Sequence, residues 1–486
     1  MLSKIYQTPL GLLTDLYELT MAHGYWQGGL AEREAVFQLT FRRPPFGGEF
    51  AVACGLETVV DWLSALQFGA DELRYLASLR GSDDQALFDD EFLAHLGKLQ
   101  FACDVDAIPE GTLVFAHEPL VRVTGPLLQA QIIETALLNL INFQTLIATN
   151  AARICRAADG DPVIDFGLRR AQGIDGGLSA SRAAYLGGCA GTSNVLAGKV
   201  FDIPVKGTHA HSWVMAFDAE QEAFQAYADA QPNNCIFLVD TYDTLEGVRH
   251  AIDVGRSLRA AGHEMLGVRL DSGDLLKLSQ LTRAILDAAG FPNAAIVASS
   301  ELDERIIRDL KEHGAKIDIW GVGTKLVTAY SQPALGGVYK LSALHDGHRW
   351  RHKIKLSDDP VKVSTPGQLQ VRRFRYDGRF VGDVLWDELS GPPRTRTVTS
   401  LDGTDSWNLQ GDGEDLLVPV IRRGETVYDL PALHEIKKHT QEQLQQVDPQ
   451  VLAADRPAAY RVGLEPSLAV LKQDLLATVR EGISCD

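Results

Sequence analysis

The segment from Lys206 to Trp213 (Lys-Gly-Thr-His-Ala-His-Ser-Trp) places a lysine, two histidines, a threonine and a serine after a short β-rich run, residues 200–205. A buried strand needs none of these groups, and each of them can hold a phosphate or move a proton. Taken alone, the segment is equally typical of a polar turn between a strand and a helix. The two interpretations differ in whether neighbouring strand ends carry similar groups.

Similar polar clusters follow five other strand-like runs of the chain. These clusters are Asp165–Arg170, Asp240–Thr244, Arg269–Asp274, Ser299–Glu301 and Gly321–Lys325. In parallel α/β folds, and in barrels above all, sites form at the carboxyl ends of the strands. Capping of the following helices would account for Asp271 and Ser300. It does not account for Arg169, His211 or Arg269, so the six clusters together predict one common site.

The residue types at these strand ends indicate a substrate that carries phosphate. Gly321-Val-Gly-Thr324 follows the penultimate strand of a barrel-like series, where exposed backbone N–H groups commonly hold a phosphate. Arg169 and Arg269 can bind phosphate or carboxylate through the two prongs of the guanidinium group. No Gly-x-x-x-x-Gly-Lys-Ser/Thr loop occurs, so a nucleoside triphosphate would not be held in a Walker-type cradle.

Carboxylates and an aromatic ring complete this set of groups. Asp240 and Asp271 offer oxygens for sugar hydroxyls, or for a Mg²⁺ ion bound mainly through substrate phosphates with no fixed protein ligands. Phe166 offers a ring face on which a flat molecule can stack. Together the groups predict a sugar-phosphate substrate and a flat acidic partner.

Composition limits the classes of partner. The 486 residues are 45% hydrophobic and 23% charged, with a net charge of −18 from 46 basic and 64 acidic residues. These values are ordinary for a globular protein of two or three domains. The negative charge opposes binding to nucleic acid or to an anionic membrane by simple attraction. An anionic substrate would therefore need a local group of cations and N–H donors.

Cysteine spacing and hydropathy favour a cytoplasmic location. The six scattered cysteines include no Cys-x-x-Cys pair, which is typical neither of a disulfide framework nor of a zinc knuckle. Residues 1–9 lack the apolar core of a signal peptide. The most apolar long run, residues 127–149, contains several glutamines, asparagines and a glutamate, so it predicts a buried helix and no membrane span.

Alternating strand-like and helical runs from about residue 160 must position the polar clusters. The strand-like runs are residues 163–166, 200–205, 235–240, 265–270, 295–299, 317–320 and 337–341. Most are separated by helical patterns, at residues 179–189, 220–230, 244–261, 274–289 and 302–313. This alternation predicts an α/β fold with parallel strands and crossover helices. About seven such units favour an irregular TIM-like (β/α) barrel, and an open doubly wound sheet is the alternative.

The flanking regions have a different pattern. Near the N-terminus a half-buried strand at residues 35–41 precedes a basic turn, Arg42-Arg43, which either meets an anion or ends the strand. After residue 345 an Asp377-Gly378 turn predicts an antiparallel hairpin. The expected parts of the chain are 1–150, with a long helix leading to the barrel; 151–345, the barrel; 346–430, a return to the first domain; and 431–486, a helical segment.

Six segments, in this order along the chain, resemble nicotinate phosphoribosyltransferases: Thr14–Met21, Asp165–Arg170, Gly191–Asn194, Gly207–Ser212, Arg269–Gly273 and Gly321–Lys325. The resemblance covers most of the first 345 residues and is weak beyond about residue 400. It implies condensation of nicotinate with phosphoribosyl pyrophosphate to nicotinate mononucleotide and pyrophosphate, with ATP hydrolysis coupled, as the first step of NAD salvage. It also implies an α/β sandwich domain built from both chain ends, an irregular seven-stranded barrel and a homodimer with shared active sites.

The resemblance further implies a role for each matching residue. His211 would be phosphorylated transiently by ATP, for which an unprotonated imidazole nitrogen is a suitable nucleophile, and His209 is the less suitable of the two histidines. Phe166 and Tyr17 of the partner subunit would sandwich the pyridine ring. Arg169 would meet the carboxylate of the base or the pyrophosphate.

The phosphoribosyl group would be held by a second set of residues. Arg269 and Asp271 would bind it, Asp271 through the ribose hydroxyls, and Gly321 and Gly323 would bind the 5′-phosphate through backbone N–H groups. Further substrate-binding candidates at the same strand ends are Thr208, Asp240, Ser299 and Thr324.

Ser193 bears on the choice of base. Relatives that use nicotinamide resemble this pattern but carry an aspartate at this position, where it can accept from the amide group. A carboxylate there would repel nicotinate, whereas the Ser193 hydroxyl can donate to it. The sequence therefore favours nicotinate, and nicotinamide phosphoribosyl transfer is the first alternative.

Two further alternatives belong to other classes of protein. A barrel aldolase or lyase would act on a sugar phosphate through a Schiff base at Lys206 or Lys325, and borohydride would trap its substrate. A regulatory binding protein would bind a sugar phosphate or nucleotide without turnover. A binding protein rarely needs both acids and a reactive histidine, so the six polar strand ends favour an enzyme.

Overall fold

A computed structural model describes residues 10–357 and 359–482 and divides the chain into two units. Unit 1 contains the residues up to Leu146 and those from Ala334 onward, and unit 2 is Ile147–Pro333. Both units combine helices with sheets, so the prediction of an α/β protein is confirmed. Residues 1–9, where the sequence lacks the pattern of a signal peptide, lie outside the described residues.

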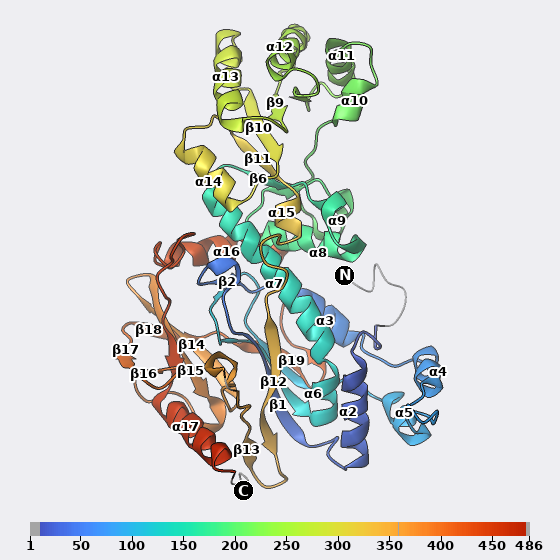
Figure 1. Cartoon of the computed structure of the whole chain (residues 1–486), viewed down its shortest axis with the longest axis vertical. Coiled ribbons are helices and arrows are strands. Elements are labelled where there is room, and N and C mark those ends of the chain that lie inside the picture. The colour runs from blue at the N-terminus through green and yellow to red at the C-terminus, as the bar shows by residue number, and fades with distance from the viewer. Residues whose placement is uncertain (1–9, 358, 483–486) are drawn as a thin grey trace. The chain divides into compact units, whose positions relative to one another are not determined.

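Unit 1 is built on two sheets whose strands come from both ends of the chain (Figure 1). The first has the order β13-β12-β1-β5-β3-β19-β20, and all its neighbours are antiparallel. The second has the order β17-β16-β21-β15-β14-β18, and a small third sheet pairs β2 with β4. The strands are β1 (Glu34–Phe41), β2 (Ala51–Val52), β3 (Asp104–Ala107), β4 (Leu113–Val114), β5 (Pro119–Pro126), β12 (Gly337–His345), β13 (Trp350–His352), β14 (Leu369–Tyr376), β15 (Arg379–Asp387), β16 (Thr397–Ser400), β17 (Ser406–Asn408), β18 (Asp412–Asp415), β19 (Val418–Arg422), β20 (Glu425–Thr426) and β21 (Val462–Leu464).

Helices cover these sheets with their apolar sides. Helix α6 packs against β1 and β5, and α17 packs against β16 of the second sheet. The helices are α2 (Leu16–Gln27), α3 (Leu56–Ser64), α4 (Ala70–Ser78), α5 (Asp90–Leu96), α6 (Leu127–Ile132), α7 (Glu134–Ala157), α16 (Leu433–Gln446) and α17 (Pro466–Arg480), with short 3₁₀ turns at η1 (Pro45–Gly47), η3 (Pro360–Lys362) and η4 (Glu388–Ser390). The buried helix expected from the apolar run at 127–149 is therefore confirmed as α6 and α7, and α7 continues into unit 2.

The β14–β15 hairpin turns where the sequence predicts it. Asp377 and Gly378 both have positive φ angles, 49° and 72°, as a two-residue turn between twisted strands requires. The strands then bury Phe374 and Val384 in a core cluster with Val398 of β16.

A buried charge network crosses the second sheet at Arg373. Its guanidinium group is fully buried and binds Asp383 through Nη2–Oδ2 (2.6 Å), and it donates to the Leu113 carbonyl oxygen (2.8 Å). The Tyr460 hydroxyl donates to Asp383 Oδ1 (2.9 Å), and the Phe380 ring lies 4.5 Å from the guanidinium carbon. The buried guanidinium group therefore has both a charged partner and a further hydrogen-bond acceptor. A buried ion pair is tolerated when its groups are hydrogen-bonded in this way.

We expect Arg373→Met to lower the free energy of unfolding by about 3–5 kcal/mol, because it leaves Asp383 charged and buried without its cation. The neighbouring variant Arg372→Met is the matched control. Arg372 pairs with Asp415 near the surface, so its loss should cost no more than about 1 kcal/mol. Urea unfolding followed by circular dichroism compares the two, and equal midpoints would contradict this account of the network.

A second buried acid, Glu18, lies on the inner side of α2. Gln131 Nε2 donates both to Glu18 Oε2 (2.7 Å) and to Glu134 Oε2 (3.1 Å), so one amide serves two carboxyl groups. Burial raises the pKa of Glu18 to about 7; the charges of Glu134 and Asp15 add to this, and the Gln131 hydrogen bond opposes it. Lys340 Nζ lies 3.8 Å from Glu134 Oε1 on the other side of the pair.

This pKa makes the stability of unit 1 depend on pH. Between the ordinary value of 4.5 and about 7, the folded chain holds a proton on Glu18 that the unfolded chain has lost. The free energy of unfolding therefore falls as the pH rises through this window. We expect Glu18→Gln, which keeps a hydrogen-bonding group, to remove most of this fall, while Glu91→Gln at an exposed position of α5 keeps it. Urea midpoints from pH 5 to pH 8 test this, and a wild-type slope in Glu18→Gln would contradict it.

Unit 2 contains one parallel sheet with the order β7-β6-β11-β10-β9-β8. Figure 1 shows β6, β11, β10 and β9 side by side. The strands are β6 (Val163–Asp165), β7 (Gly191–Thr192), β8 (Ile236–Leu238), β9 (Gly267–Leu270), β10 (Ala295–Ser300) and β11 (Ile319–Val322). The predicted crossover connections between parallel strands are confirmed.

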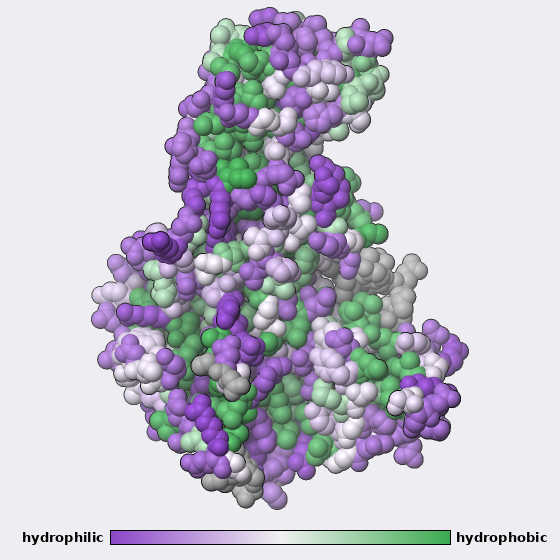
Figure 2. Space-filling model, in the orientation of Figure 1, coloured by the Kyte–Doolittle hydropathy of each residue, from purple (hydrophilic) through white to green (hydrophobic). Residues whose placement is uncertain are grey.

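The helices of unit 2 pack as amphipathic crossovers. For example, α12 buries Val248, Ile252 and Leu258, and hydrophilic side chains cover much of its outer side in Figure 2. The helices are α8 (Gly173–Leu186), α9 (Val195–Phe201), α10 (His211–Met215), α11 (Glu220–Ala230), α12 (Thr244–Ala260), α13 (Leu275–Ala288), α14 (Glu304–Glu312) and α15 (Thr324–Val327), with a 3₁₀ turn at η2 (Leu168–Arg170).

Two strand-like runs expected in the barrel series do not form strands of the parallel sheet. Residues 337–341 belong to β12, which pairs antiparallel with β1 in unit 1, because strand propensity does not specify which sheet a strand joins. The run at 200–205 is mostly not a strand: α9 extends to Phe201, and Val205 makes a single parallel bridge to Thr192. The short strand β7 was not predicted.

The expected barrel is not confirmed by the sheet pairing. Among residues 10–357 and 359–482, no strand pairing joins β8 to the opposite end of the parallel sheet. The segment after Val205 nevertheless reaches β8 through a side chain, because the Leu238 N–H donates to His209 Nε2 (3.2 Å).

Candidate active site

A cavity of about 350 Å³ lies in unit 2 at the carboxyl ends of the parallel strands. Its lining includes most of the predicted site residues: Phe166, Arg169, Ser193, Thr208, Arg269, Asp271, Ser299, Gly321, Gly323 and Thr324. Arg170, His209 and Glu301 also line it. The convergence follows from the parallel sheet, which brings segments far apart in sequence to one edge.

The predicted residues outside the lining are Tyr17, Asp240 and His211. Tyr17 belongs to unit 1, where it is 49% exposed on α2. Burial raises its pKa to about 12, and a hydrogen bond with Glu18 acts in the same direction. Asp240 and His211 lie beside the cavity and contact its lining.

Asp271 is held by groups on two neighbouring strands. Ser299 Oγ donates to Asp271 Oδ1 (2.5 Å), and the Asp271 N–H donates to Asp240 Oδ2 (2.9 Å). Ser272 Oγ donates to the same oxygen of Asp240 (2.6 Å), while Asp240 Oδ1 is buried without a partner in the described structure. Asp240 therefore orients the end of β9, and its Oδ1 has no partner among the described residues.

Arg269 ties β9 to the polar segment that follows Val205. Its Nη1 donates to Thr208 Oγ1 (2.6 Å) and its Nη2 to the His209 carbonyl oxygen (2.9 Å). Burial lowers the pKa of Arg269, and the negative charges of Asp271 and Asp240 oppose that shift. The cation thus fixes the segment on which both histidines lie.

The two histidines of this segment differ in environment. His209 is 7% exposed, and Tyr227, Phe224 and Phe237 surround its ring. Burial lowers its pKa to about 4, and Nε2 accepts from the Leu238 N–H. The ring is therefore neutral at neutral pH, with its proton on Nδ1.

His211 begins helix α10, and its side chain is 41% exposed. Nδ1 lies 3.1 Å from Thr241 Oγ1, and Nε2 lies 3.8 Å from Asp271 Oδ2. A hydroxyl and a carboxylate therefore flank the ring on its two nitrogens, and solvent reaches it. Of the two rings, this is the one with access for a reactant.

The lysines of the Schiff-base alternative lie outside the cavity lining. Lys325 Nζ forms an ion pair with Asp303 (2.8 Å). Lys206 is exposed. This arrangement gives no support to a buried, deprotonated lysine nucleophile.

Gly321 makes room for the Phe166 ring. A Cβ atom at Gly321 would lie 2.6 Å from two carbons of that ring and 3.2 Å from Ser299 Cβ. Packing against the Phe166 ring therefore favours glycine at this position, in addition to the phosphate contact that the sequence predicts.

Sequence reasoning included Asp165 in a polar cluster but gave this buried acid no role, and it missed the hydroxyl groups that bind it. Asp165 is 1% exposed and accepts from Ser181 Oγ (2.8 Å) and Thr192 Oγ1 (2.7 Å). A charged residue inside an apolar strand run was the signal in the sequence that could have identified it.

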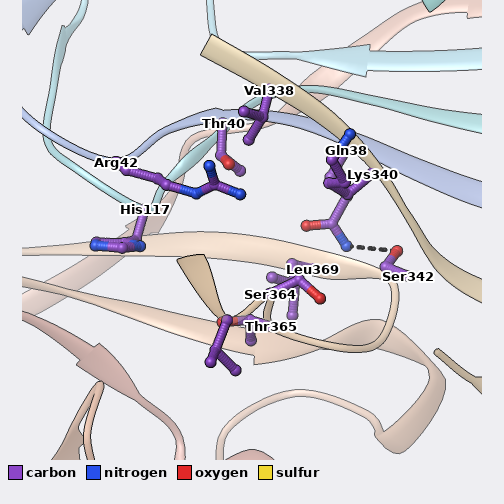
Figure 3. Close-up of a pocket in the computed structure, with 11 residues that line it drawn as sticks. Gln38, Thr40, Arg42, His117, Val338, Lys340, Ser342, Ser364, Thr365 and Leu369 are labelled. Atoms are coloured by element: carbon purple, nitrogen blue, oxygen red, sulfur yellow. Dashed lines mark hydrogen bonds between the residues drawn. The ribbon is translucent and has the colours of Figure 1, made fainter. Parts of the chain in front are cut away.

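A second, smaller pocket of about 40 Å³ lies in unit 1. Figure 3 shows Arg42, His117 and Lys340 around it, with Gln38 Nε2 donating to Ser342 Oγ (2.9 Å). Burial lowers the pKa of His117 to about 4, so that its ring is neutral at neutral pH. The basic turn at Arg42 thus lines a pocket whose cationic groups suit a small anion.

Neither a protein-built metal site nor a membrane span occurs in the part of the chain that the structure describes. No group of three or more histidine, cysteine, aspartate or glutamate residues there could hold a metal ion. None of the helices there has the length and apolar character needed to cross a bilayer.

Comparisons with known proteins cover almost the whole chain. Residues 12–142 match the nicotinate phosphoribosyltransferase N-terminal domain, 162–374 the nicotinate phosphoribosyltransferase family, and 370–472 the corresponding C-terminal domain. The nicotinate phosphoribosyltransferase of Bacillus subtilis (strain 168) is 42% identical over 469 residues, which is 94% of this chain and 93% of the relative. The human nicotinate phosphoribosyltransferase is 36% identical over 529 residues, 96% of each chain.

Solved structures agree with these matches. The crystal structure of human nicotinic acid phosphoribosyltransferase superimposes with a TM-score of 0.83 at 33% identity, covering 95% of this chain and 99% of that one. A nicotinate-nucleotide pyrophosphorylase from Pyrococcus furiosus has a TM-score of 0.70 at 23% identity, covering 90% and 96%, and shares the fold.

Proposed function

The chain belongs to the nicotinate phosphoribosyltransferase family, and from this premise we propose that it couples ATP hydrolysis to nucleotide formation through a phosphohistidine at His211. Nicotinate and phosphoribosyl pyrophosphate would give nicotinate mononucleotide and pyrophosphate, a step of NAD biosynthesis. The observation that carries the proposal is the convergence of the predicted residues on one cavity beside an exposed histidine.

The base would enter between aromatic groups. Phe166 lines the cavity with its ring seated on Gly321, and Ser193 lies on the neighbouring strand end. A pyridine ring on Phe166 could place its carboxylate toward Arg169 or the Ser193 hydroxyl. Tyr17 of a partner subunit would cover the other ring face, which requires a homodimer with shared sites. Its exposure on α2 suits that role.

The phosphoribosyl group would lie across the remaining strand ends. Asp271 would bind the ribose hydroxyls, oriented by Ser299 and by the Asp240 contact to its backbone. Gly321, Gly323 and Thr324 would bind the 5′-phosphate at the end of β11. These contacts would align the pyridine nitrogen with the anomeric carbon while pyrophosphate departs, so that catalysis comes mainly from orientation and charge stabilisation.

Mg²⁺ would be held here mainly through the substrate phosphates. The Asp271 carboxylate lines the cavity, and Asp240, which accepts from the Asp271 N–H, has a buried oxygen, Oδ1, without a partner in the described structure. When bound, the ion would neutralise charge on the departing pyrophosphate. Arg169 and Arg269 would supply further positive charge from the chain itself.

We also propose that the parallel sheet closes into a barrel between β7 and β8. Val205 extends the parallel sheet beyond β7, and the next residues bind β8 through His209. These contacts support a TIM-like arrangement in which the 205–209 segment fills the gap between β7 and β8.

The test is to incubate the protein with phosphoribosyl pyrophosphate and either nicotinate or nicotinamide, with and without ATP and Mg²⁺. We expect nicotinate mononucleotide and its stimulation by ATP. Product from nicotinamide alone would refute the choice of base, and product from neither would refute the proposed activity. Product at a rate that ATP does not change would refute the coupling.

A further inference from the structure

Four buried polar residues of unit 2 form one hydrogen-bonded network behind the cavity. Asp165, Ser181, Thr192 and Asn194 are each 1% exposed. Thr192 Oγ1 (2.7 Å) and Ser181 Oγ (2.8 Å) approach the same oxygen of Asp165, Oδ2. The Gly167 N–H donates to the other oxygen, Oδ1 (2.8 Å).

Two chains of hydrogen bonds lead from Asn194 to Asp165 in this network, and Ser181 Oγ also lies 3.0 Å from the Gly177 carbonyl oxygen. The Asn194 N–H donates to Thr192 Oγ1 (3.0 Å), and Asn194 Nδ2 donates to Ser181 Oγ (3.2 Å). Each hydroxyl that accepts from Asn194 can then donate its single proton to Asp165. An ionised carboxylate only accepts, so it is the natural end of both chains. Burial raises the pKa of Asp165, and the three donated hydrogen bonds oppose that shift.

The same residues fix the backbone at two walls of the cavity. Asp165 and Thr192 are register partners on the parallel strands β6 and β7, so Phe166 and Ser193 are the next residues on each strand. The Ser193 N–H donates to the Asp165 carbonyl oxygen (2.8 Å), and the Phe166 N–H donates to the Val322 carbonyl oxygen (2.8 Å). The Asp165 side chain closes the turn after Phe166 through Gly167.

We propose that the Asp165–Thr192–Ser181–Asn194 network is the positioning element of the base subsite, which sets the spacing between the Phe166 ring and Ser193. This inference rests on the proposed function, because these two residues are the expected walls around nicotinate. Thr192 is the member best suited to a test, since it joins Asp165 to the backbone of Asn194 one residue beyond Ser193.

The decisive comparison is Thr192→Val with Thr192→Ser. Valine keeps the volume and removes the hydroxyl, whereas serine keeps the hydroxyl. We expect Thr192→Val to raise the KM for nicotinate about tenfold, in line with the loss of a hydrogen bond to a charged group. The KM for phosphoribosyl pyrophosphate and the labelling of the protein by [γ-³²P]ATP should change less than about twofold, because their groups lie on other strands. Thr192→Ser should restore the wild-type KM.

Thr282→Val is the matched control for removing a buried hydroxyl from this unit. Thr282 is fully buried in α13, and its hydroxyl has no partner in the described structure, so both KM values should stay unchanged. Equal rises in both KM values for Thr192→Val, or no rescue by serine, would overturn the inference in favour of a merely structural network.

Ser181→Ala serves as a second variant if Thr192→Val does not fold. It removes the other hydroxyl on Asp165 Oδ2 and should give the same selective rise in the KM for nicotinate. The proposed function is tested separately by the wild-type assay. If the wild type consumes nicotinate and neither variant changes its KM selectively, only the present inference fails.

Discussion

Replacement of His211 by alanine is expected to abolish acid-labile ³²P labelling of the protein by [γ-³²P]ATP, with a fall of at least about 100-fold in labelling rate, because the nucleophile itself is lost. His211 has an exposed ring beside Asp271, and Thr241 lies at its other nitrogen. Stimulation of nucleotide synthesis by ATP should be lost together with the label.

His209→Gln provides the control two residues away. The lone pair of His209 Nε2 is already used by the Leu238 N–H, and Nδ1 is buried and carries the proton, so neither nitrogen offers an accessible lone pair to a phosphoryl group. Glutamine keeps an acceptor for that N–H, and the variant should retain labelling per mole of folded protein. Labelling that survives in His211→Ala and disappears in His209→Gln would place the phosphate on His209 and contradict the assignment to His211.

Gly321→Ala is expected to lower kcat/KM for nicotinate about 100-fold. The new Cβ would lie 2.6 Å from the Phe166 ring, and the backbone on both sides of that ring is hydrogen-bonded. The ring must therefore move toward the cavity, and a displacement of about 1 Å at a positioning contact can cost about 10²-fold. Stability should change little, because the ring has open space into which to move.

Three further variants distinguish this clash from a general effect of alanine. Gly176→Ala lies in α8 where a Cβ meets no atom within 4 Å, and its activity should equal that of the wild type. Phe166→Ala alone loses the stacking face, and adding Gly321→Ala to it should cost little more, since the clash is gone. Steady-state kinetics with nicotinate as the varied substrate measures all four, and additive losses in the double variant would contradict the packing argument.

Local patterns in the sequence predicted most elements but not the partners of every strand. The Asp377-Gly378 hairpin and the helix at Glu220–Ala230 depend on nearby residues, and both form where the sequence predicts them. Residues 337–341 have the composition of a strand, yet their sheet is chosen by contacts with β1, about 300 residues earlier in the chain. That pairing is a long-range property, which a local pattern does not contain.

The candidate site was predictable to the extent that function required unusual residue types at strand ends. Arg269 and Asp271 were identified because a charged residue next to an apolar strand is costly to bury, so its presence there indicates a function. The packing of Phe166 on Gly321 was not predictable, because it depends on the distance between two strands. The Asp165 network was missed for the same reason: Ser181 and Asn194 are ordinary residues until the fold brings them to one carboxylate.

The interleaved order of the strands in the first sheet of unit 1 has a consequence for synthesis on the ribosome. β1 can pair with β5 early, but its other neighbour, β12, is made only about 300 residues later, after all of unit 2. At about 5–20 residues per second, the nascent chain presents this apolar strand edge for roughly 15–60 s. An unpaired edge is a template for pairing with other chains. We therefore expect the edge of β1 to need protection during translation, and we expect chaperone dependence to be strongest for chains stalled between β1 and β12.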